Sequence, residues 1–197
     1  MKKAFLLVVI LFVSVISTAC INNLAVQELN NKAKTYLDQG DFENAISRLK
    51  SSIDLDSTIF ETHYNLGIAY TQAEKYPEAV ETFQNAIKLK PDFADTYYSL
   101  AVAQENYAKG IIDGTIKEKA KGDKETESVN SDEIKNDKKL SKDETVQVAK
   151  LLNDSIASYS AYLEKGKNIE DKQDVEEKIK YLQTQLLKYS DKPLTAE

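Results

Sequence analysis

The stretch that decides the fold is residues 60–93, FETHYNLGIAYTQAEKYPEAVETFQNAIKLKPDF. Shifting the sequence by 34 positions brings this stretch into register with the residues on both sides of it. The shift superposes residues of the same kind at many positions: Ala33 with Gly67 and Ala101, Tyr36 with Tyr70, Ala45 with Ala79, Leu49 with Phe83, and Leu66 with Leu100. A fixed period of this length indicates an array in which each repeat is one supersecondary unit stacked on the next.

The central unit resembles a tetratricopeptide repeat, abbreviated TPR. Its signature residues stand at the spacing of that family: His63, Leu66, Gly67 and Tyr70, then Ala79, Phe83, Ala86 and Pro91. The resemblance implies two antiparallel helices per unit. It also explains why Gly67 and Ala79 are small, because the two helices approach most closely there. His63 occupies a slot that is commonly aromatic, so we expect it to pack against a neighbouring helix rather than to act as a ligand or a base.

The expected fold is all-α: a short α-solenoid of about three TPR-like helix pairs with a C-terminal capping helix. Residues 26–110 are expected to hold units one and two and the first helix of unit three. A charged insertion, 111–141, then divides the third unit. It has many charged and few apolar residues, so it cannot bury enough apolar surface to fold by itself. The capping-box pattern from Ser141 to Glu144 begins the second helix of that unit, 142–166. Residues 167–197 form the capping helix and a tail.

Residues 1–19 have the pattern of an export signal, in which two lysines precede an apolar run too short to favour a transmembrane helix. Cys20, the single cysteine of the chain, follows directly. This order resembles a bacterial lipoprotein signal, which implies cleavage before Cys20, acylation of its thiol, and a short tether over 20–25. We therefore expect an exported protein held by lipid on the outer membrane or the cell surface, on the periplasmic face in a diderm. Ser17 stands where that motif usually has leucine, so plain secretion remains the alternative.

The composition excludes much chemistry. The 26 basic and 32 acidic residues give a formal charge of −6, which disfavours nucleic acid as a partner. One histidine and one cysteine cannot form a zinc site or a thiolate–imidazole pair. The sequence also shows no phosphate-binding glycine loop, nucleophile elbow or metal motif. We expect a protein that is not an enzyme and has no cofactor and no metal site.

TPR arrays bind other proteins in a concave groove lined by the first helix of each unit. Carrying the groove positions over to this chain gives a set of predicted partner-binding residues: Asn30, Asn31, Lys34, Glu61, Tyr64, Asn65, Ile68, Gln72, Asp95, Tyr98, Ser99, Val102 and Glu105. Tyr64 and Tyr98, one unit apart, would form an apolar strip with carboxylates at its edge. Such a strip suits an extended peptide or a helix with apolar anchors and basic residues. The alternative for both tyrosines is ordinary packing between units.

Three functions are compatible with these patterns. The first is a non-catalytic, membrane-anchored scaffold or assembly factor that binds other proteins in the bacterial cell envelope. The second is a periplasmic ligand-binding or transporter-accessory protein, which would need a closed apolar cavity. The third, an unrecognised enzyme, is disfavoured by the small number of titratable groups suited to catalysis. The chaperone-tail clamp of some TPR proteins is also disfavoured, because Asp95 and Ser99 stand where it needs lysine or arginine.

Overall fold

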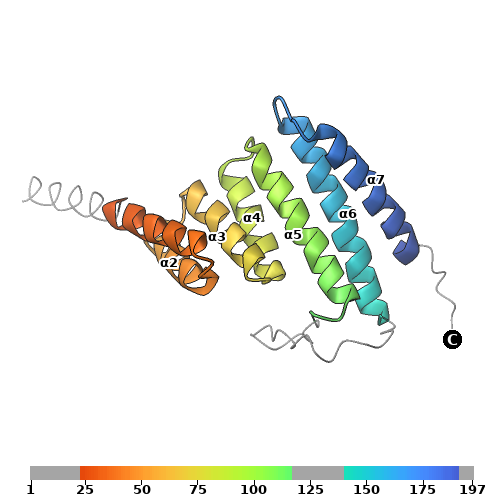
Figure 1. Ribbon diagram of the computed structural model, residues 1–197, viewed down its shortest axis with the longest axis horizontal. Coiled ribbons are helices and arrows are strands. Elements are labelled where there is room, and N and C mark those ends of the chain that lie inside the picture. Colours follow the sequence, from red (N-terminus) through yellow and green to blue (C-terminus); the bar gives the residue numbers. More distant parts are fainter. Residues whose placement is uncertain (1–22, 117–139, 191–197) are drawn as a thin grey trace, which may run out of the picture.

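The computed structural model describes residues 23–116 and 140–190. All regular elements in these two ranges are helices, which confirms the predicted all-α fold: residues 23–38, α2 (Phe42–Leu55), α3 (Phe60–Gln72), α4 (Tyr76–Leu89), α5 (Ala94–Ile112), α6 (Lys142–Lys165) and α7 (Lys172–Ser190). They follow one another along the molecule in chain order (Figure 1). The predicted signal and Cys20 lie outside the described residues, as does most of the charged insertion. Within the described ranges, no helix is long and apolar enough to span a membrane.

The same turn joins the two helices of units one and two. Gly40 and Glu74, which are 34 residues apart, both have a left-handed backbone, with φ of 73° and 58°. One residue later, the N–H of Asp41 donates to the carbonyl of Tyr36, and the N–H of Lys75 donates to that of Tyr70, both at 2.9 Å. The period of the sequence is therefore a period of the backbone.

Unit three lacks this turn. Ala108 occupies the position of Gly40 and Glu74, but it lies inside α5, which continues to Ile112. The sequence predicted that this helix ends near Tyr107, with the insertion starting at 111. Instead Ile111 is fully buried against α6, so this residue belongs to the core. The first helix of unit three is longer because its left-handed residue, Gly114 with φ of 73°, comes six positions after Ala108.

The helix 142–166 was predicted as the second helix of unit three, and α6 packs along α5 in that role. Across the pair, the Ser155 hydroxyl donates to the carbonyl of Ala101 at 2.9 Å, and the Ser158 hydroxyl donates to the Gln104 side chain at 2.8 Å. At its start, Ser141 and Glu144 form the predicted capping box. The cap fixes where the chain re-enters a helix after the insertion.

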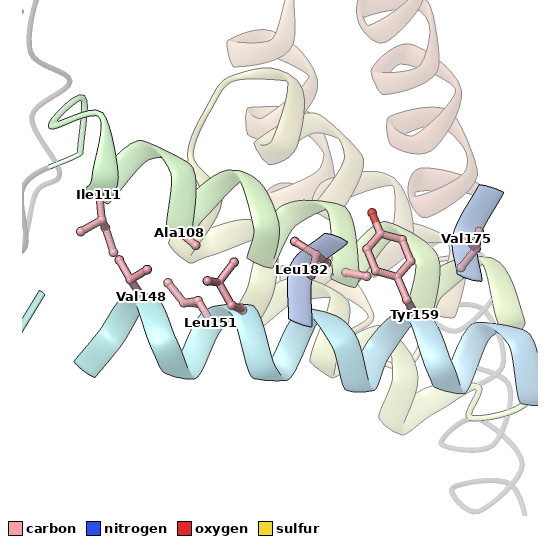
Figure 2. Close-up of a cluster of buried hydrophobic side chains, with 9 residues drawn as sticks. Ala108, Ile111, Val148, Leu151, Tyr159, Val175 and Leu182 are labelled. Atoms are coloured by element: carbon pink, nitrogen blue, oxygen red, sulfur yellow. The ribbon is translucent and has the colours of Figure 1, made fainter. Parts of the chain in front are cut away.

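Three hydrophobic clusters form the core, each from three consecutive helices. The first joins residues 23–38, α2 and α3, and the second joins α3, α4 and α5. The third lies between α5, α6 and α7, where side chains of α6 face Ala108 and Ile111 of α5 (Figure 2). Val175 and Leu182 of α7 are buried in it, so an apolar stripe of the last helix covers this end of the core. α3 and α5 each belong to two of these clusters, so the core is continuous along the array, as in a solenoid.

The close approach predicted at Gly67 is confirmed. A Cβ built on this residue would lie 2.6–2.8 Å from three ring carbons of Phe83, which is fully buried in α4. Real side chains do not approach so closely, so the ring occupies the space that any larger residue would need. In unit one the equivalent residues are Ala33 and Leu49, which lie in the same hydrophobic cluster.

Candidate peptide-binding face

The first helices of the three pairs lie next to one another. The Asn30 side chain of residues 23–38 bonds to Thr62 of α3, and α3 in turn contacts α5. We call the exposed side of residues 23–38, α3 and α5 the first-helix face. This is the side of the array on which the sequence places its predicted binding residues.

A repeated hydrogen bond sets the start of α3 and α5. Nε2 of His63 donates to the carbonyl of Ser57 at 2.8 Å, and the Tyr97 hydroxyl donates to the carbonyl of Pro91 at 2.9 Å. Both donors and both acceptors are 34 residues apart. His63 is also buried. It therefore acts as the packing residue of its signature slot and fastens the helix to the preceding loop.

Tyr64 is half-buried within an aromatic cluster. Its ring centroid lies 5.8 Å from that of Phe60, 6.0 Å from that of Phe83 and 5.7 Å from that of Phe93. The ammonium of Lys90 covers Phe60 and Phe93 at 4.9 and 4.8 Å from their centroids. The tyrosine ring therefore stabilises the junction of units two and three, and only part of it reaches the first-helix face.

Tyr98 is more open, with 37% of its surface exposed. Its ring forms T-shaped pairs with the rings of Tyr159 and Tyr162 of α6 at centroid distances of 5.5 and 5.2 Å. Within the described residues, the ring contacts of Tyr64 and Tyr98 belong to separate clusters. Tyr98 is the large aromatic side chain that this face presents to solvent.

Asn30 points into the array. Its Nδ2 donates to the Ser52 hydroxyl at 2.9 Å, to the Thr62 hydroxyl at 3.0 Å and to the carbonyl of Val26 at 2.9 Å. Ser52 and Thr62 are fully buried, so the amide satisfies polar groups at the junction of units one and two. The structure assigns Asn30 a packing contact rather than a place among the exposed groups.

The other predicted residues divide by exposure. Asn31, Lys34, Glu61, Gln72 and Asp95 are exposed. Asn65, Ile68, Ser99 and Val102 are half-buried. Ile68 packs on the cluster of Phe83 and Leu100, and Val102 packs on the core shared with α6 and α7. The apolar members thus support the face, while the polar members are free to contact a partner.

Glu105 bridges three helices. It accepts the Tyr159 hydroxyl of α6 at 3.2 Å and the ammonium of Lys178 of α7 at 2.9 Å. Burial, followed by the negative charge of Glu105, raises the pKa of Tyr159. This network closes the α7 end of the first-helix face.

An open pocket of about 450 Å³ lies at the same end, between the first turn of α5 and the turn from α6 to α7. It is lined by Ala94, Asp95, Tyr162 and residues 166–171. The Tyr162 hydroxyl donates to Oδ1 of Asp171 at 2.9 Å. Burial, this hydrogen bond and the charges of Asp171 and Asp95 raise the pKa of Tyr162 to about 12. The described residues contain no group of three histidine, cysteine or acidic side chains arranged to hold a metal.

Comparison with known families agrees with this geometry. Two overlapping segments, residues 33–73 and 69–106, match the family described as TPR repeat. This chain contains TPR repeats. The match includes the complete second unit and ends within α5, before the charged insertion divides unit three. A search of curated proteins finds no significant match.

The TPR repeat protein also shares its fold with solved structures. The first TPR domain of Spaghetti (RPAP3), bound to the HSP90 peptide SRMEEVD, gives a TM-score of 0.57 at 16% identity, covering 82% of this chain and 94% of that chain. The second TPR domain of human RPAP3, with the HSP70 peptide SGPTIEEVD, gives 0.56 at 15%, covering 81% and 98%. The Arabidopsis OM64 TPR domain gives 0.56 at 10%, with the same coverage. At identities this low, the similarity shows a shared fold and nothing more.

The sequence of this TPR repeat protein did not predict three of these features. They are the inward turn of Asn30, the ion pair from Lys178 to Glu105, and the pocket beside Asp95. A signal existed for the first, because Ser52 replaces the small apolar residue of the signature and implies a polar partner nearby. The ion pair and the pocket depend on how α7 and the turn before it lie relative to α5. No spacing of residues in the sequence specifies this arrangement.

Proposed function

We propose that this TPR repeat protein is a non-catalytic scaffold that binds another polypeptide on its first-helix face. The observation that carries the proposal is the exposed ring of Tyr98, which lies among free polar side chains on a row of adjacent first helices. Aromatic residues that are partly buried and firmly packed are the groups that most often anchor a protein interface. Exposed polar residues elsewhere on the same face, such as Gln72, can supply hydrogen bonds to a bound polypeptide.

We further propose that the partner differs in charge from the chaperone tails seen in two of the related structures. Those peptides, SRMEEVD and SGPTIEEVD, are acidic at their C-terminal ends. In this chain the exposed carboxylate of Asp95 would repel such an end, and Ser99 offers no positive charge. A neutral or basic segment is therefore the better match.

We propose that the scaffold works in the bacterial cell envelope, tethered through acyl chains on Cys20. The support is the sequence order of lysines, apolar run, small residues and cysteine. Two or more acyl chains give a durable membrane anchor, whereas one does not. Replacing Cys20 with serine should move the protein to the soluble fraction after cell lysis, and continued membrane retention would contradict the acyl anchor.

A capture experiment tests binding to the first-helix face. Tyr98→Ala combined with Gln72→Ala removes exposed groups of this face, so we expect loss of partners that copurify with the tagged protein. The matched control is Lys50→Ala with Gln84→Ala, because both residues are exposed on second helices. Tyr64 is left unchanged, because its substitution would remove aromatic contacts of the core. Loss of binding could then not be told from loss of folding. Equal partner recovery from both variants would overturn the proposal.

The second function predicted from the sequence, a ligand-binding accessory protein, needs a closed apolar cavity. The pocket between α5 and the turn from α6 to α7 is open and lined by charged residues, so it does not provide one. This pocket therefore gives that function no support.

A further inference from the structure

The pocket at the start of α5 continues the first-helix face. Asp95 belongs to both, since it is an exposed residue of α5 and also lines the pocket. Tyr162, another lining residue, contacts the exposed ring of Tyr98 at a centroid distance of 5.2 Å. A polypeptide bound over Tyr98 would therefore pass the mouth of this pocket and could extend a side chain into it.

The pocket has a negative lining. Asp95, Glu170 and Asp171 supply three carboxylates against the one ammonium of Lys167, which gives a net charge of −2 at neutral pH. Asp171 is already held by the Tyr162 hydroxyl. Asp95 forms no hydrogen bond or ion pair with any other residue that the structure describes, so its carboxylate is available. Its charge reaches the pocket wall, since it contributes to the raised pKa of Tyr162.

An aromatic ring completes the lining. The hydrogen bond from Tyr162 to Asp171 at 2.9 Å fixes the ring at the pocket wall. An aromatic face attracts a cation through its quadrupole, and a nearby carboxylate adds a charge-assisted hydrogen bond. Together these groups match the ammonium of lysine or the guanidinium of arginine, whose aliphatic stems can lie along a ring.

We propose that this pocket receives a lysine or arginine side chain of the polypeptide that binds the first-helix face. The proposal rests on the proposed function and adds the chemistry of one anchor in the partner. The pocket volume of about 450 Å³ lies within the range of sites that hold small ligands. Asp95 is the main attractive charge, and Tyr162 is the surface on which the stem rests.

The test uses single amino acid derivatives, so that it does not depend on the identity of the partner. N-acetyl-lysine methylamide and N-acetyl-arginine methylamide are titrated into the ¹⁵N-labelled full chain in a mild detergent. The neutral N-acetyl-glutamine methylamide and the acidic N-acetyl-glutamate methylamide are the control compounds. We expect saturable amide shifts at Ala94, Asp95 and residues 166–171 with the two basic compounds only.

Two variants with the same charge separate the pocket from general attraction. Asp95→Asn should weaken binding of the basic compounds about fivefold, the size of an exposed ion pair. Glu81→Gln, on the exposed side of the second helix α4, should leave binding unchanged because Glu81 does not line the pocket. Tyr162→Phe should retain binding, since the ring remains.

Several results would overturn the proposal. They are equal shifts with the glutamine compound, stronger binding of the glutamate compound, or equal weakening by both charge variants. If the basic compounds fail to bind while the Tyr98 and Gln72 variant still loses its partners, the pocket proposal is wrong and the scaffold proposal stands. If the basic compounds bind and that variant keeps its partners, the scaffold proposal is wrong.

Discussion

Gly67→Ala should destabilise the protein through the ring of Phe83. In the structure the added methyl group would lie 2.6, 2.7 and 2.8 Å from three carbons of that ring. Phe83 is fully buried, so it cannot move aside without disturbing the cluster around it. Overpacking of this kind costs about 1–3 kcal/mol. Alanine recovers up to about 1 kcal/mol through its higher helix propensity. The net expectation is a loss of about 1–2 kcal/mol in the free energy of unfolding.

A second variant isolates the cause. Phe83→Leu reproduces Leu49, the residue that unit one pairs with Ala33. In the Phe83→Leu background, Gly67→Ala should therefore be neutral or stabilising by up to about 1 kcal/mol, because the ring is gone. The difference between the two backgrounds is the coupling energy of the two positions, expected at about 1–3 kcal/mol.

Urea unfolding followed by circular dichroism at 222 nm measures all four proteins. A constant slope with urea would show that the variants differ in stability rather than in the extent of unfolding. The reasoning would be refuted if Gly67→Ala were as stable as the parent, or if its effect were the same with phenylalanine and with leucine at position 83.

Three further predictions concern the turn, the buried amide and the tyrosine of the pocket. Glu74→Gly should stabilise the protein by about 0.5–1 kcal/mol, and Gly40→Ala should destabilise it by about 1 kcal/mol, because both positions have a left-handed backbone. If urea unfolding showed that both variants change the free energy of unfolding in the same direction, this prediction would be contradicted. Asn30→Ala should cost about 1–2 kcal/mol in the same assay, since two buried hydroxyls lose a donor and keep only each other at 3.5 Å. A cost below about 0.5 kcal/mol would count against the network. The pKa of Tyr162 is raised to about 12, so its protonated form favours folding; the resulting stability is complete below pH 10 and is lost as the pH rises towards 12. Tyr162→Phe should therefore lose less stability over that range, and an identical pH profile would refute this.

The helix pairs and their order followed from the sequence because small, large and aromatic residues recur at fixed positions. Gly67, Ala79 and Phe83 mark a contact that any pair of antiparallel helices of this type must make. The helix 142–166 could likewise be assigned to unit three, since its cap and its apolar face are local patterns.

The length of α5 could not be predicted in the same way. The position of Ala108 holds glycine in unit one and glutamate in unit two, so the residue type at this position does not identify the turn. Ile111 is buried only because α6 returns across the insertion to cover it. The burial of the last turn of α5 therefore depends on contacts between residues far apart in the sequence, while Gly114, with φ of 73°, lies in the turn that follows it.

The candidate site was only partly accessible to sequence reasoning. The position of a residue in the repeat predicts which side of a helix it lies on. It does not predict which neighbouring groups form hydrogen bonds with its side chain. Asn30 illustrates this, because the hydroxyls of Ser52 and Thr62 draw its amide inward. Tyr98 remains 37% exposed although two rings of α6 pack against it, and its position in the repeat does not specify this degree of exposure.

Site-specific photo-crosslinking tests the central claim most directly. The photoreactive residue p-benzoylphenylalanine is placed at Gln72 or Tyr98 on the first-helix face, and at Gln84 or Lys150 on the exposed side of second helices. The protein is then irradiated in the cells that produce it. We expect adducts with the same polypeptide from Gln72 and Tyr98 and none from Gln84 and Lys150. Adducts confined to the second helices, or equal from both sides, would contradict binding on the first-helix face.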